Sequence, residues 1–196
     1  MRELEFRKTN QLLREENDWI HRYKYPAMTL WQYHLIGRVD DTAHFEVGDP
    51  RGHDVYDFAL NTRVRWSKNV MDERTCPNQI LLGAFDDEFC IFIMLSIYLE
   101  SFLEQHPNPK YLFSEQMDKN APKKLKGTYS RRLQKVVWST EEFKGIEEEA
   151  DYNKGGGIGT HSSRKFPATY ARNKGCTSEE VEIRGRWKKN GSRVVF

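Results

Sequence analysis

The C-terminal stretch GTHSSRKFPATYARNKGCTSEEVEIRGRWKKNGSRVVF, residues 159–196, is the part of the sequence that decides the fold. Its His161 and Arg164 stand three positions apart, so on a helix both side chains project from one face. An arginine binds two phosphate oxygens as a fork, and a helix N-terminus favours negative charge. The stretch is therefore compatible with a phosphodiester ligand, but a single His-x-x-Arg pattern arises by chance in many proteins, and taken alone the chance interpretation is slightly favoured.

The charge of the chain is unevenly distributed. The 196 residues contain 31 Lys and Arg against 29 Asp and Glu, a formal net charge of +2. Residues 1–118 hold 13 basic and 20 acidic residues, a net of −7, whereas residues 119–196 hold 18 and 9, a net of +9. This asymmetry indicates a polyanionic partner that faces the second half of the chain.

Several classes of protein are disfavoured by composition and spacing. The longest apolar run, Phe89 to Leu99, is about half of what a bilayer-spanning helix needs, so we expect no membrane insertion. The three cysteines lack a Cys-x-x-Cys spacing and the six histidines lack metal-ligand spacing, so we expect no disulfide framework and no metal site. The run 155–159 (GGGIG) lacks the ending of a nucleotide-binding loop and is interpreted as a hinge.

The hydrophobic pattern predicts a mostly helical α+β domain with a small antiparallel β-sheet. We expect this domain over residues 26–196, truncated at its C-terminus, after an N-terminal helix or linker over residues 1–25 that is mostly exposed. A proline at position 26 predicts the start of the first domain helix, and alternation predicts a β-hairpin over residues 62–84. Further helices are expected from Phe89 to about His106, and over Thr128–Trp138, Thr140–Ala150, Thr160–Lys174 and Ser178–Trp187. Ser178 is expected to cap the N-terminus of the last of these helices. Residues 107–127 are expected to be loop, with a short strand at 111–113.

The stretch from residue 159 resembles the catalytic domain of the tyrosine recombinase (phage integrase) family. It is most similar to eukaryotic mobile-element members of the DIRS and Crypton types. The motifs that carry the resemblance are His161-Ser162-Ser163-Arg164-Lys165, Ala168-Thr169-Tyr170-Ala171, Gly175-Cys176-Thr177 and Gly185-Arg186-Trp187. Two further elements occur in the family's order: Gly37-Arg38 followed by Asp41, and Lys68 on the predicted hairpin.

The resemblance implies a site for breaking and rejoining DNA strands without a cofactor. Arg38 and Arg164 would hold the nonbridging phosphate oxygens, and Lys68 would protonate the leaving 5′-oxygen. His161 would help to take the proton of the nucleophile, and Trp187 would donate its ring N–H to the phosphate. Asp41 would orient the arginine region. Two structural alternatives stay open: Trp187 as a core residue and Asp41 as a helix cap.

The family's tyrosine nucleophile is expected at position 196, where this sequence has Phe196. Phenylalanine has no hydroxyl group, so we expect double-stranded DNA binding without cleavage. The alternatives are a fragment whose tyrosine lies just past residue 196, and a non-catalytic domesticated module that binds DNA or another protein.

Beyond the catalytic set, Arg131, Arg132 and Lys165 are expected to contact DNA. The resemblance further implies a homo-oligomer on DNA and a location in the nucleus.

Overall fold

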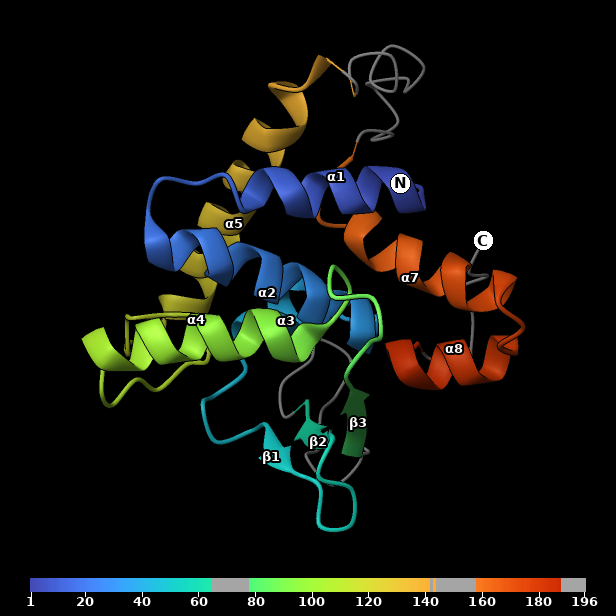
Figure 1. Ribbon diagram of the computed structural model, residues 1–196, viewed down its shortest axis with the longest axis horizontal. Helices are drawn as coiled ribbons and strands as arrows, with labels where there is room; N and C mark the ends of the chain where they lie inside the picture. The colour runs from blue at the N-terminus through green and yellow to red at the C-terminus, as the bar shows by residue number, and fades with distance from the viewer. Residues whose placement is uncertain (65–77, 142, 144–157, 188–196) are drawn as a thin grey trace.

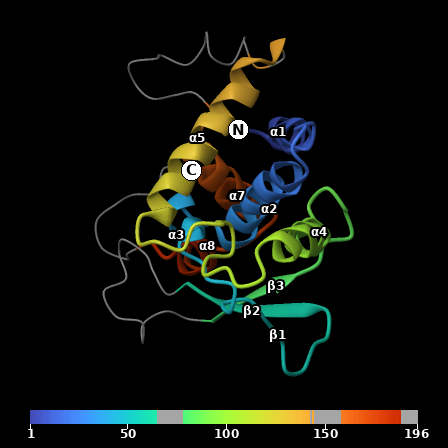
Figure 2. The same cartoon turned by 90° about the vertical axis from the view of Figure 1, so that its left-hand side faces the viewer.

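Helix α2 (Trp19–Leu35) forms the centre of the fold, and α1 (Glu3–Leu13), α4 (Ile91–Gln105) and α7 (Ser162–Asn173) pack against it. The structure is a computed structural model, and it describes residues 1–64, 78–141, 143 and 158–187. Figure 1 shows α1, α2 and α4 as a layer of roughly aligned helices, with α7 and α8 (Ser178–Gly185) beside it. Figure 2 shows α5 (Ala121–Trp138) along one side of this layer, where it contacts α1 and the short α3 (Val39–Ala43).

Local signals define the ends of α2. The Asp18 carboxylate accepts a hydrogen bond of 2.8 Å from the backbone N–H of His21, which caps the N-terminus. The helix ends at Ile36, which adopts the left-handed conformation with φ of 47°. Between these ends the buried side chains include Met28, Leu30 and Trp31, so packing outweighs the proline in the helix interior.

Helices α4 and α5 follow the apolar periodicity of their sequences. The buried positions of α4 recur three or four residues apart at Ile91, Met94, Leu95, Tyr98 and Phe102. Helix α5 repeats this pattern, with Leu125, Tyr129, Leu133, Val136 and Val137 buried and a basic outer face. The Tyr129 hydroxyl lies 2.9 Å from the Thr29 hydroxyl of α2, which supplies a hydrogen bond inside the core.

The sheet has three antiparallel strands in the order β1-β2-β3: β1 (Arg51–Gly52), β2 (Ala59–Arg63) and β3 (Asn78–Leu82). Asn61 pairs with Ile80 across β2 and β3, and with Arg51 across β1 and β2. The expected hairpin and the expected fold class, mostly helical with a small antiparallel sheet, are therefore confirmed. Strand β1 is an addition that the sequence pattern did not predict.

Two expectations for the N-terminal region are wrong. Helix α1 is not mostly exposed, because Phe6 and Leu13 are fully buried in the main core. The helix expected to start at Pro26 starts at Trp19, so the boundary expected between residues 25 and 26 falls inside α2. Burial of both flanks of the proline overrides its preference for a first helical turn.

Other element boundaries also differ from expectation. Helix α5 begins at Ala121 rather than Thr128, since Pro122 occupies its first turn, where a proline is tolerated. The short strand expected at 111–113 does not form: Tyr111 makes isolated bridges to Glu46 and Ser114, and residues 112 and 113 lie in a turn. Helix α8 is capped by Thr177 rather than Ser178, and Thr177 and Glu180 form a reciprocal capping box. The acidic helix expected over 140–150 and the hinge over 155–159 lie largely outside the described residues.

Candidate phosphate-binding site

Arg164 is held in place by the residues that follow α8. It lies in the first turn of α7 and is 7% exposed. Its Nη2 donates a hydrogen bond of 2.5 Å to the backbone carbonyl of Gly185, and its guanidinium lies 4.6 Å from the ring centroid of Trp187. Its Nε is buried and has no hydrogen-bond partner among the described residues. This arginine is therefore fixed by protein on one side and retains an unused donor.

Arg38 and Asp41 lie at the N-terminus of α3. Arg38 is the N-cap residue, and its backbone N–H donates to Oδ2 of Asp41 at 3.1 Å. The same carboxylate oxygen accepts a bond of 2.8 Å from Nη2 of Arg186, and both side chains of this pair are nearly inaccessible. Asp41 is thus a helix cap, one of the two roles considered for it from the sequence, and it is also part of a buried ion pair.

The electrostatics of the site show a concentration of positive charge. Burial, reinforced by the neighbouring charges of Arg38 and Arg186, lowers the pKa of Arg164 to about 10, whereas Asp41 acts to raise it. Within the described part of the chain, the Arg38 guanidinium makes no ion pair. Two neighbouring guanidinium groups repel each other unless an anion lies between them. The arrangement therefore has the chemistry of an anion site.

Trp187 combines the two roles considered for it, that of a core residue and that of a site residue. It packs against the small cluster of Ile36, Ala168 and Val181, which agrees with a core role. Its ring also stacks on Arg164, which places it in the site. A Cβ on Gly185 would come within 2.6 Å of the Trp187 ring, so only glycine fits at this position.

We expect Gly185→Ala to displace the Trp187 ring and to lower the free energy of unfolding by about 1–3 kcal/mol, a typical cost of overpacking. Gly127→Ala is the matched control, because nothing lies within 4 Å of a Cβ at that helical glycine. Denaturant unfolding of both variants measures the difference. Equal stability of the two variants would contradict the close packing of Gly185 against Trp187.

The other predicted site residues lie near the start of α7, on α5 or outside the described residues. His161 and Lys165 are exposed near the start of α7, in the same turns as Arg164. Arg131 is exposed on α5. Arg132 is half-buried and forms an ion pair with Glu16, which neutralises it. Lys68 and Phe196 lie outside the described residues.

Two arginines that hold the turn beside the site, Arg184 and Arg186, were not predicted from the sequence. Arg184 donates to the carbonyls of His34 and Ile80, each at 2.8 Å, and so ties α8 to α2 and β3. Burial and the charge of Arg186 lower the pKa of Arg184 to about 10. Arg186 lies inside the Gly185-Arg186-Trp187 motif, in which only Trp187 was assigned a role.

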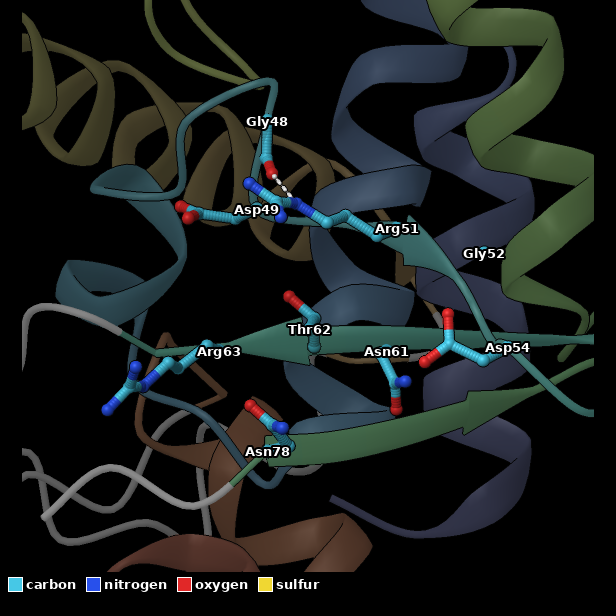
Figure 3. A pocket seen from close by; sticks show the side chains of 9 residues that line it. All are labelled: Gly48, Asp49, Arg51, Gly52, Asp54, Asn61, Thr62, Arg63 and Asn78. Carbon is cyan, nitrogen blue, oxygen red and sulfur yellow. Dashed lines mark hydrogen bonds between the residues drawn. The ribbon is translucent and has the colours of Figure 1, made fainter. Parts of the chain in front are cut away.

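A polar cavity of about 460 Å³ lies between β2 and the segment that contains β1 (Figure 3). Its wall combines Arg51 and Arg63 with Asp49 and Asp54, so basic and acidic groups offset each other. Neither Arg38 nor Arg164 lines it. The cavity is therefore distinct from the arginine site.

The fold was compared with solved structures. Lambda integrase, in the crystal structure of its tetramer bound to a Holliday junction, matches 99% of this chain with a TM-score of 0.55 and 14% sequence identity. The described architecture is an integrase fold. The chain spans about half, 48%, of the length of that integrase chain. No protein-family profile matches the sequence, and a search of curated proteins finds no match.

None of the helices described is long and apolar enough to cross a membrane. In the same part of the chain, no group of three or more His, Cys, Asp or Glu side chains is placed to hold a metal ion.

Proposed function

We propose that this integrase fold binds double-stranded DNA at a tyrosine-recombinase-type site, in which Arg38 and Arg164 hold one phosphodiester. The observation that carries the proposal is the placement of these two arginines, from α3 and α7, around residues 185–187: the Gly185 carbonyl accepts a hydrogen bond from Arg164, and Arg186 pairs with Asp41, whose Oδ2 also accepts the backbone N–H of Arg38. The charge of Arg38 also lowers the pKa of Arg164. A phosphate between them would relieve this repulsion and accept forked hydrogen bonds. The similar lambda integrase structure is bound to a Holliday junction, which supports a DNA partner.

The proposed chemistry follows from the same residues. Arg38 and Arg164 would stabilise negative charge on the phosphate oxygens. The Trp187 ring would fix the orientation of the Arg164 guanidinium that lies over it. Lys68 and His161 retain the roles that the family resemblance implies. Phe196, at the expected nucleophile position, has no hydroxyl for a covalent link, so the proposed activity of this chain is binding without cleavage.

Three finer features belong to the same proposal. The mobile-element origin rests on the HSxRK, ATYA and GxW motifs of residues 161–187. The homo-oligomer on DNA is supported by the similar lambda integrase structure, which is a tetramer. The nuclear location rests on the eukaryotic character of the motifs.

A salt titration with a fluorescein-labelled duplex tests DNA binding. We expect the logarithm of the association constant to fall linearly with the logarithm of the salt concentration, with a slope of about −0.9 for each phosphate contacted. A duplex with an uncharged methylphosphonate backbone is the control and should bind far more weakly. On a nicked duplex we expect no covalent adduct in a denaturing gel, and an adduct would contradict the inactivity.

The alternative function is a non-catalytic protein-interaction module. The exposed apolar side chains Val55, Tyr56 and Phe58 favour this alternative, because they form an apolar tip on the connection between β1 and β2, where the Tyr56 and Phe58 rings are in contact. The titration also separates these functions. Absence of duplex binding at low salt would reject the DNA proposal and leave this module as the better explanation.

A further inference from the structure

Arg186 is a buried arginine for which the proposed function has no role. It follows α8 and adopts the left-handed conformation, with φ of 54° and ψ of 44°. This conformation is unfavourable for a residue that has a Cβ, so surrounding interactions must hold it. The interaction that the structure shows is the ion pair with Asp41, in which the two side chains are 8% and 3% exposed.

The turn that contains Arg186 contacts both arginines of the site. The residues on either side of it hold Arg164, through the Gly185 carbonyl and the Trp187 ring. Arg186 itself reaches Asp41, whose Oδ2 also accepts the backbone N–H of Arg38. A single turn therefore connects the start of α3 with the start of α7.

Asp41 could neutralise the site if it were released. It is a buried carboxylate near Arg38 and Arg164, and it acts on the charge of Arg164. The ion pair with Arg186 uses its Oδ2 and compensates its charge, whereas its Oδ1 has no hydrogen-bond partner among the described residues. A buried carboxylate without a cation is costly and would recruit the nearest arginine. With Arg186 in place, Asp41 is already paired.

We propose that Arg186 is a positioning residue that occupies the Asp41 carboxylate and thereby leaves the Arg38 and Arg164 guanidiniums available for a DNA phosphate. This inference rests on the proposed function, because it assigns a purpose to the unneutralised charge of those two arginines. It predicts that the Asp41 carboxylate, once unpaired, competes with DNA for Arg38 or Arg164. Removing the charge of Asp41 as well should then restore binding.

The test compares four forms of the full chain: wild type, Arg186→Gln, Arg186→Lys and the double variant Asp41→Asn with Arg186→Gln. The dissociation constant for a labelled duplex is measured below each variant's melting temperature, which circular dichroism provides. We expect Arg186→Gln to bind at least about 10-fold more weakly, the loss of one charge-assisted contact. Arg186→Lys keeps the charge and should bind as the wild type does.

The double variant separates positioning from mere stabilisation. We expect its affinity to return to within about threefold of the wild type, because the competing carboxylate is gone. If Arg186 served only to stabilise the fold, folded Arg186→Gln would bind the duplex as tightly as the wild type, and this result would overturn the proposal. A double variant that binds the duplex as weakly as Arg186→Gln would also overturn it. Arg186→Gln is the variant most prone to misfold, so the test also uses Arg186→Lys and the double variant. If either of these is folded and binds the duplex weakly, the proposal is rejected.

A second measurement does not require DNA. In ¹H–¹⁵N spectra of the arginine Nε–Hε groups, Arg186→Gln should shift and slow the exchange of the Arg164 or Arg38 signal, and the double variant should reverse this change. Unchanged signals in Arg186→Gln would overturn the positioning role. Failure of the wild type to bind the duplex would reject the proposed function instead, and the spectra would still decide the role of Arg186.

Discussion

Replacing Phe6 with alanine is expected to lower the free energy of unfolding by about 3–5 kcal/mol, the usual cost of removing a buried aromatic ring. Phe6 is 1% exposed. Its ring centroid lies 4.9 Å from that of Phe166, 5.2 Å from that of Tyr33 and 5.4 Å from that of Phe89. These neighbours come from three other parts of the chain, so the cavity left by alanine cannot close by a local shift.

Leu4→Ala is the matched control for Phe6→Ala. Leu4 lies on the same helix, two positions earlier, but it is 80% exposed. We expect its substitution to change the stability by less than about 0.5 kcal/mol. Chemical denaturation followed by circular dichroism measures both variants. Equal and small effects would mean that α1 does not belong to the main core.

The position of Phe6 also connects α1 to the arginine site. Phe166, which stacks on Phe6, lies two residues after Arg164 on α7. Helix α1 therefore supports the first turn of α7 from the side opposite the site. A domain without residues 1–13 would lose this support, and so the N-terminal helix is part of the fold that presents Arg164.

Helix α4 is the element that the sequence predicted best, because its apolar residues recur at the helical spacing and its buried positions follow them. The β2-β3 hairpin was predicted from alternation, but its burial is less regular: Ala59 and Thr62 are the buried residues of β2, and Gln79 and Leu81 are those of β3. The buried positions of helix α1 also recur at the helical spacing, but Glu5, Thr9 and Asn10 occupy three of them, so the sequence alone did not indicate that Phe6 and Leu13 are buried. The interior proline of α2 misled for the same reason: the packing on both sides of Pro26 is not visible locally.

The candidate site divides along a similar line. Motif order was enough to select Arg38, Asp41, Arg164 and Trp187, and the structure brings these four together. Their assigned roles stay predictions. Motif order could not reveal the partner of Arg186, because the pair with Asp41 depends on where α3 and α8 meet. Nor could it show that Glu16 pairs with Arg132, which removes that arginine from the free charges of α5.

Arg38→Ala is expected to weaken duplex binding by about 10- to 100-fold, the loss of a charge-assisted contact to phosphate. It should also make the salt slope less steep by about one. The stability should change little, because the Arg38 guanidinium makes no ion pair with the described residues and its helix-capping bond uses the backbone N–H. The substitution therefore removes a ligand contact without removing a structural one, and anisotropy titrations at several salt concentrations measure it.

Arg132→Ala is the matched control, since it removes the same side chain from a neutralised position. We expect its duplex affinity to stay within about twofold of the wild type, because its charge is already compensated by Glu16. Its stability should fall instead, since the half-buried Glu16 carboxylate loses its cation. A general attraction between DNA and positive charge would affect both variants alike. Equal losses of affinity in Arg38→Ala and Arg132→Ala would therefore contradict a specific phosphate site, whereas opposite effects on affinity and stability distinguish the two arginines by what each one contacts.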